Sequence, residues 1–272
     1  MNILNIVFFV ILMIVGIMVF RYLFVDQNTL TATNDGKMMM TINASSLPTN
    51  GSNVPLNNFA YSIWFYVNDW NYRYGESKVI FGRMGSPTKE PTNPAKQGNG
   101  GSGGSSSDSA MPAGVSGEDP CPAVVLDAVE NNLSVSIGCY PGVDEKPTTP
   151  GGTTVIHTCS VANVPIQRWV NLIVSVFGRT MDIYLDGKLV KTCLMPGIAC
   201  VNHNSSVYIT PGGGFDGWTG RFQYYATPLN PQEAWNIYGQ GYSGYSGWLG
   251  LNSYGVRVSV LQNGSATSSV TL

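Results

Sequence analysis

Charge is scarce in this chain, and the charge that is present does not favour a polyanionic partner. Charged residues make up 11% of the 272 residues, and 14 lysines and arginines against 16 acidic residues give a formal net charge of -2. Nucleic-acid binding depends on a surplus of cationic side chains that neutralise phosphates. We therefore do not expect nucleic acid among the partners.

Recognisable catalytic and metal-binding motifs are also missing. The two histidines, His157 and His203, have no His-x-x-x-His spacing, and no phosphate loop accompanies them. Asp182 and Asp186 form the nearest carboxylate pair, but along one strand they would lie about 13 Å apart, too far for either glycosidase geometry. The Gly-rich run 211–214 precedes a strand pattern, which predicts a turn. We therefore expect a protein that is not an enzyme.

The five cysteines lack any Cys-x-x-Cys spacing, which argues against a zinc site. Their odd number means that at least one is a free thiol or pairs with another chain. Cys193 and Cys200 flank a short loop that fits a disulfide if the compartment is oxidising. Cys193–Cys200 is therefore the candidate disulfide, and two reduced thiols are the open alternative.

A long hydrophobic run lies near the N-terminus, from Ile6 to Val25. It is uninterrupted as far as Phe20, and Arg21 is its only charged residue. A helix of this length crosses about 30 Å, the thickness of bilayer hydrocarbon, and Arg21 is close enough to one end to reach the headgroups. A cleaved signal peptide fits less well, because no basic region precedes the run and no clear small-x-small site follows it. We predict a single transmembrane helix within residues 1–26.

The side of the membrane occupied by the rest of the chain stays open. Under the positive-inside rule, Arg21 and Lys37 weakly favour a cytoplasmic location for the part of the chain that follows the span. A lumenal body would suit the Asn-x-Ser/Thr sequons, although a chain rich in Asn and Ser produces such triplets by chance. The sequons are at Asn43, Asn50, Asn132, Asn204 and Asn263.

Biased composition divides the chain after the predicted span. Residues 27–56 are rich in Asn, Thr and Ser, which predicts a polar stalk. Residues 85–120 form a Gly/Ser/Pro-rich insert with little apolar surface to offset the entropy of ordering. The body at 57–242 keeps enough residues for one sandwich-sized core. In the C-terminal extension, 243–272, alternating valines predict an edge strand for this body or a neighbour.

Local patterns predict an antiparallel all-β body with one short C-terminal helix. Residues 59–68, 133–139 and 170–176 alternate with the period of a pleated strand. Asp186-Gly187 between two such runs is typical of a hairpin turn, because glycine adopts positive φ at no cost. The run 230–233, Asn-Pro-Gln-Glu, has the residue types of a capped helix N-terminus. We expect Trp235 and Tyr238 of that helix to pack on the body.

Three stretches resemble the laminin-G-like domains of the concanavalin A-like lectin and glucanase superfamily. Residues 59–67 (FAYSIWFYV) are similar to its first core strand, and residues 168–193 to its Trp, strand, turn, Tyr strand and Asp-Gly hairpin. Residues 217–241 are similar to its last strand and the helix that follows. The resemblance covers 57–242 and implies a two-sheet antiparallel jelly-roll sandwich. Arg221-Phe222 departs from the acidic or aliphatic pair common in related domains, which weakens any transfer of ligand residues.

Aromatic residues in loops are the remaining binding candidates. Trp70, Tyr72 and Tyr74 lie in DWNYRYGES, and Asp216 and Trp218 lie in GFDGWTG. A flat ring offers a protein partner, or the C–H face of a sugar, a large contact at little entropic cost. The alternatives are that these rings pack beneath the insert and that Asp216 binds a calcium ion. Apart from that calcium ion, no metal or cofactor is expected.

The order of anchor, stalk and body resembles, in arrangement, the small membrane-linked proteins of large DNA viruses that lie between inner membrane and capsid. This resemblance implies a single-pass virion protein that contacts the membrane and other proteins of an assembly such as a capsid. The alternative is a membrane-displayed lectin that binds glycans through a rim loop. The sequence leaves the two functions open.

Overall fold

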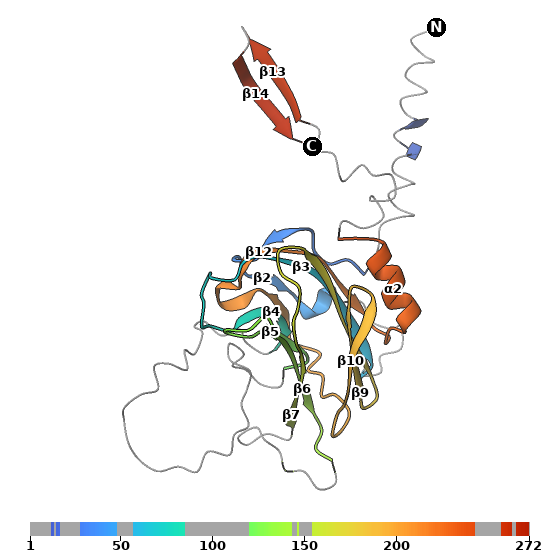
Figure 1. Ribbon diagram of the computed structural model, residues 1–272. Coiled ribbons are helices and arrows are strands. Elements are labelled where there is room, and N and C mark those ends of the chain that lie inside the picture. The colour runs from blue at the N-terminus through green and yellow to red at the C-terminus, as the bar shows by residue number, and fades with distance from the viewer. Residues whose placement is uncertain are drawn as a thin grey trace.

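The structure, a computed structural model, describes residues 12–13, 15–16, 28–47, 57–84, 120–142, 146 and 154–242, and the backbone of a C-terminal hairpin. Two six-stranded antiparallel sheets face each other (Figure 1). Sheet A has the order β1 (Asn34–Asp35), β12 (Asp216–Tyr225), β3 (Phe59–Asp69), β8 (Trp169–Phe177), β9 (Thr180–Leu185), β10 (Lys188–Leu194). Sheet B has the order β2 (Met40–Ile42), β11 (Val207–Ile209), β4 (Lys78–Arg83), β5 (Ala123–Leu126), β6 (Leu133–Cys139), β7 (Val155–Val161). The expected two-sheet sandwich is confirmed.

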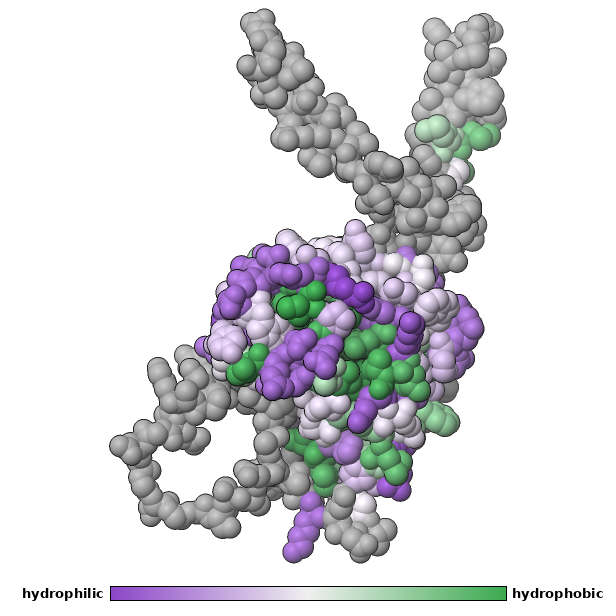
Figure 2. Space-filling view, in the orientation of Figure 1, coloured by the Kyte–Doolittle hydropathy of each residue, from purple (hydrophilic) through white to green (hydrophobic). Residues whose placement is uncertain are grey.

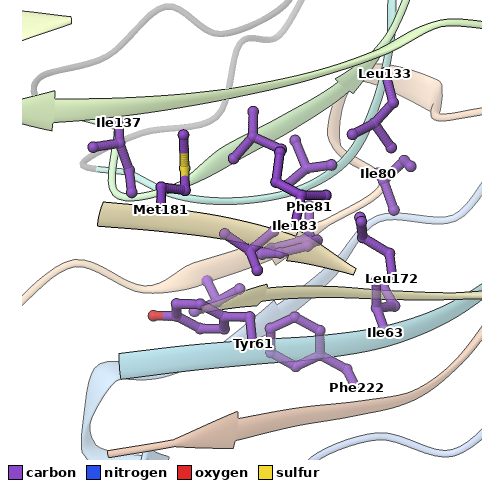
Figure 3. Packing of buried hydrophobic residues seen from close by; sticks show 14 of the residues in the cluster. Tyr61, Ile63, Ile80, Phe81, Leu133, Ile137, Leu172, Met181, Ile183 and Phe222 are labelled. Carbon is purple, nitrogen blue, oxygen red and sulfur yellow. The ribbon is translucent and has the colours of Figure 1, made fainter. Parts of the chain in front are cut away.

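Apolar side chains of both sheets meet in one core. The alternating residues predicted to face inward on β3 are buried there, because successive side chains of a strand point to opposite faces. Figure 3 shows inward residues of sheet A (Tyr61, Ile63, Leu172, Phe222) packed against those of sheet B (Ile80, Phe81, Leu133, Ile137). The other face of β3 is also covered, so residues 59–65 are buried on both sides.

Helix α2 (Pro231–Gly239) covers part of the outer face of sheet A. Its capping box is present as predicted: Asn230 Oδ1 accepts from the N–H of Glu233 at 3.0 Å, and Glu233 Oε2 accepts from the N–H of Asn230 at 2.8 Å. Ala234 and Ile237 are buried against the sheet. Tyr238 packs on the body as expected, with its ring stacked on Trp64. Trp235 contacts the Gly187 turn but stays 49% exposed, because it lies one residue beyond the inward-facing position of Ala234.

The predicted hairpin between β9 and β10 is confirmed. Asp186 and Gly187 take φ values of +50° and +73°, as a two-residue turn requires. A Cβ atom on Gly187 would also lie 2.9 Å from Tyr238 Cβ and 3.1 Å from Trp235 Cα. The turn therefore needs glycine both for its backbone conformation and for the close approach of α2.

Edge strand β10 is the most exposed strand whose burial is described. The residues from Lys188 to Thr192 are all exposed, and Leu189 and Val190 are among them. Figure 2 shows apolar residues, in green, reaching the surface on the side of the body that carries β10 in Figure 1. Lys188, Lys191 and the β-bulge after Leu189 disfavour pairing of this edge with a strand of another sheet.

Residues 28–47 are part of the sandwich rather than a stalk. Asn28 O accepts from the N–H of Tyr224 at 3.3 Å, and the N–H of Leu30 donates to Phe222 O at 2.8 Å. Strand β1 continues this pairing along β12, and β2 pairs with β11 of the other sheet; the short 3-10 turn η1 (Ala44–Ser46) follows. The predicted stalk is therefore wrong over residues 28–47, because a polar segment also suits an edge strand with one solvated side.

The disulfide joins the two sheets, and the predicted pair Cys193–Cys200 is wrong. Cys193 of β10 is bonded to Cys159 of β7, with 6.2 Å between their Cα atoms. These strands are the end strands of sheets A and B on the same side of the sandwich. Cys200 lies beside β6 instead, where its N–H donates to Gly138 O at 2.8 Å. Closeness along the chain misled the prediction, because the sheets bring together cysteines 34 residues apart.

Several predicted segments fall outside the described residues. Of the predicted span Ile6–Val25, four residues are described, and they are helical: Leu12, Met13, Val15 and Gly16. Among the residues that the structure describes, no helix is long and apolar enough to cross a membrane. The insert at 85–120 is likewise outside, except for Pro120. In the extension, β13 (Arg257–Gln262) pairs with β14 (Ser265–Thr271) in a sheet of its own.

Removing the disulfide should destabilise the sandwich. Closing a 34-residue separation restricts the unfolded chain, so Cys159→Ala should lower the free energy of unfolding by about 3 kcal/mol in oxidised protein. Denaturant unfolding of the full chain measures this, and reduction of the wild type should reproduce it. The control is Cys200→Ala, which should change stability far less. The pairing is wrong if the two variants exchange these effects.

Candidate functional site

Loops from both sheets meet at one end of the sandwich and form what we call the loop rim. It consists of the turn 36–39 between β1 and β2, the loop 70–76 after β3, the turn 127–132 between β5 and β6, and the loop 211–215 before β12. Three of the predicted binding residues, Trp70, Tyr72 and Tyr74, lie here, and Asp216 is next to the rim at the start of β12. The structure therefore brings the two predicted loops together.

Trp70 holds two parts of the rim together. Its Nε1–H donates to Val129 O at 3.1 Å, and Lys78 Nζ lies 4.8 Å from the centre of its ring. The Gly75 N–H donates to Ala128 O at 3.0 Å, which ties the same two loops by their backbones. Burial lowers the pKa of Lys78. One face of the Trp70 ring lies under an ammonium group and its N–H is hydrogen-bonded, so Trp70 packs within the rim. The alternative, that these rings pack beneath the insert, concerns residues outside the described part of the chain.

Tyr72 and Arg73 attach the glycine-rich loop to the rim. The Tyr72 hydroxyl donates to Gly213 O at 3.3 Å, and Arg73 Nη1 donates to Gly212 O. Arg73 Nε also pairs with Glu76 at 2.7 Å. The run 211–214 contains the short 3-10 turn η3 (Pro211–Gly213) and leads into β12, which confirms the predicted turn.

Asp216 is held by a cation and an amide. Lys37 Nζ forms an ion pair with Asp216 Oδ1, and Asn68 Nδ2 donates to Asp216 Oδ2 at 2.8 Å. Lys37 Nζ also lies 4.9 Å from the centre of the Tyr72 ring. The hydrogen bond from Lys37 lowers the pKa of Asp216, and the same bond raises the pKa of Lys37. A calcium ion at Asp216 would have to displace Lys37. Within the described ranges, no group of three or more His, Cys, Asp or Glu residues is placed to hold a metal.

Apolar and aromatic side chains stand at the tips of these loops. Met38 is 69% exposed and Tyr74 is 59% exposed, and Met39 and Val129 are exposed as well. The loops that carry them are fixed by the hydrogen bonds of Trp70, Tyr72, Arg73 and Asp216. The rim is thus a preorganised surface with apolar contact groups, and of the predicted rings Tyr74 is the most available to a partner.

Trp218 lies outside the rim, although it is two residues from Asp216. It is on the outer face of sheet A, opposite Tyr66 of β3 and beyond a bulge between Asp216 and Gly217. There it begins a continuous row of seven rings, which we call the aromatic strip: Trp218, Tyr66, Trp169, Tyr242, Trp64, Tyr238 and Trp235.

The strip joins the sheet to α2. Trp169 stacks on Tyr242 with ring centres 4.6 Å apart, and Trp64 stacks on Tyr238 at 5.7 Å. Arg221 fixes the chain just before Tyr242, because its guanidinium donates to Gly241 O at 2.9 Å and to Gln240 Oε1. The residue that departs from the laminin-G-like pattern therefore positions the end of α2.

Sequence reasoning missed the strip as a unit. Its members come from β3, β8, β12, α2 and the residue Tyr242, so no single stretch of sequence contains the pattern. One signal was present: Trp64 and Tyr66 occupy the face of β3 opposite to the core residues. Large aromatic rings on that side of the strand indicate that something packs there.

No family model and no curated protein matches this chain. Similar solved structures include the receptor-binding domain of botulinum neurotoxin D, with a TM-score of 0.45 and 11% identity. The binding domains of botulinum neurotoxin DC in complex with SialylT and with rat synaptotagmin II have TM-scores of 0.44 and 0.43, at 12% and 13% identity.

These matches cover 77–78% of this chain and 42–43% of the toxin chains, so the chain spans less than half the length of those proteins. Structural likeness of this degree carries no information on ligand or partner.

The ion pair between Lys37 and Asp216 should make the folded protein less stable at acid pH. Folding lowers the pKa of Asp216. Ionised Asp216 therefore adds to the free energy of unfolding above the pKa it has in the unfolded chain, and this stabilisation is lost as the pH falls through the pKa it has in the folded protein. Lys37→Met should raise the pKa of Asp216 toward its ordinary value, as measured by NMR titration of the carboxyl carbon. Lys191→Met on β10 is the control and should leave that pKa unchanged. A titration of Asp216 unaffected by Lys37→Met would contradict the assignment.

Proposed function

We propose that this chain is a non-enzymatic, single-pass membrane protein whose sandwich binds a partner protein through the loop rim. The observation that carries the proposal is that exposed apolar side chains stand on loops that hydrogen bonds already hold in place. Met38, Met39, Tyr74 and Val129 present thioether, aromatic and aliphatic surface. Met and aromatic residues are enriched in protein interfaces.

Rigidity of the rim supports a binding role. A surface that is ordered before contact loses less conformational entropy when a partner binds. Here the loop after β3 is bonded to the turn between β5 and β6 by Trp70 and to the glycine-rich loop by Tyr72 and Arg73. The tips are therefore held in place without a ligand.

Structural use of the carboxylates supports a non-catalytic role. Asp186 accepts from the Asn171 N–H and pairs with Arg168, and Asp182 accepts from the Thr192 hydroxyl. Glu233 caps α2. Each of these carboxylates is engaged in a turn, a strand pair or a helix cap rather than held in a cleft.

Membrane attachment is proposed from the sequence. The run Ile6–Val25 has the length and composition of a spanning helix. The laminin-G-like resemblance over 57–242 agrees with an interaction module. The arrangement of anchor and body further suggests the interface between the inner membrane and capsid of a large virion, where the partner would be a capsid protein.

A lectin is the second candidate function. Tyr74 favours it, because an exposed ring beside Arg73 and Glu76 offers both a stacking face and polar contacts for a sugar. The protein partner is preferred, because the neighbouring tips Met38, Met39 and Val129 have no polar groups with which to bind sugar hydroxyls.

A photo-crosslinker at the rim tests the proposal. In the full chain, benzoylphenylalanine at position 74 should form a covalent adduct with one protein when it is irradiated in its native membrane, together with the proposed capsid partner. The same group at Phe177, which is 66% exposed at the opposite end of the sandwich, should not. Adducts from both positions, or from position 177 alone, contradict a rim interface.

With that partner purified, Tyr74→Ala should weaken its affinity at least about tenfold, as expected for a central aromatic contact. Phe177→Ala is the matched control and should leave the affinity unchanged. Specific binding to a glycan array that Tyr74→Ala abolishes would favour the lectin instead.

A further inference from the structure

We propose that the outer face of sheet A lies on the bilayer, with Trp218, Trp235 and Tyr242 in the interfacial layer of the lipids. This inference rests on the proposed membrane anchor and adds a second contact with the membrane. It assigns a role to the aromatic strip, which the loop rim does not use.

The first support is the short connection between the predicted span and the sandwich. The span ends at Val25, and Asn28 is already hydrogen-bonded to Tyr224 of β12. Three residues of extended chain reach at most about 11 Å. The edge of sheet A beside β12 must therefore stay within about that distance of the membrane surface, and the sandwich cannot stand away from the bilayer on a stalk.

The second support is the kind of residue exposed on this face. Of the five tryptophans that the structure describes, two are exposed, Trp218 at 44% and Trp235 at 49%, and both belong to the aromatic strip. Tyr242 of the strip is exposed as well. Trp and Tyr are enriched where membrane meets water, because their rings are apolar while the indole N–H and the phenol hydroxyl stay hydrated.

The third support is the position of the strip relative to the tether. Trp218 is in register with Asp35 of β1, so one end of the strip lies at the same sheet edge as Asn28. The other end lies on α2, where Ala234 and Ile237 pack inward and Trp235, which lies beside the Gly187 turn and the Tyr238 ring, stays 49% exposed. A membrane that approaches this face can therefore contact the exposed rings of the strip, Trp218, Tyr242 and Trp235, while the loop rim at the end of the sandwich stays accessible.

Fluorescence quenching by brominated lipid tests the inference. The full chain is reconstituted in phosphatidylcholine vesicles whose acyl chains carry bromine near the carboxyl end, and its tryptophan emission is compared with that in unbrominated vesicles. The double variant Trp218→Phe/Trp235→Phe should lose most of the quenching seen in the wild type. The control Trp70→Phe removes a tryptophan of the rim and should leave the quenching unchanged.

The outcomes separate the inference from the proposed anchor. Quenching that survives in the double variant overturns the membrane-facing assignment, even if the chain floats with the vesicles. A wild-type chain that does not float with the vesicles overturns the anchor and the inference with it. Thermal unfolding of each variant verifies the fold, and the single variants Trp218→Phe and Trp235→Phe should each lose part of the quenching if the double variant is destabilised.

Discussion

Burial of apolar side chains between two antiparallel sheets is the interaction on which the other features of this protein depend. Each fully buried aliphatic or aromatic side chain contributes about 1.5–3 kcal/mol, and the inward residues of both sheets form one contiguous cluster. This packing fixes the strand order, and the strand order decides which loops share an end of the sandwich. Loop residues far apart in the sequence, such as Lys37 and Asp216, meet only because β1 and β12 are neighbours.

A second layer of packing on sheet A separates the two candidate surfaces. Helix α2 and the aromatic strip cover the outer face of β3 and β8, so residues such as Trp64 are buried without belonging to the central core. Arg221 and the Gly187 turn hold the helix in place from opposite sides. Because the strip lies on a face and the loop rim lies at an end, the proposed membrane contact and the proposed partner contact use different surfaces.

The hydrogen-bonded rim and the sheet-to-sheet disulfide both connect parts of the chain that are far apart in the sequence. Cys159–Cys193 ties the end strands of the two sheets, and the hydrogen bonds of Trp70, Tyr72 and Arg73 tie the loops. Each of these connections joins distant parts of the chain and therefore opposes local unfolding of the segments that it links.

The sequence by itself determined the elements whose signals are local. The alternation in β3, the Asp186-Gly187 turn and the capping box at Asn230 depend on neighbours within a few residues, and all are present. Tertiary structure alone decided the rest. It paired Cys193 with Cys159 instead of Cys200, built residues 28–47 into the sheets, and placed Trp218 on a different surface from Asp216. These outcomes depend on which strands lie side by side, and that choice is made by the packing of the whole core rather than by any short stretch of residues.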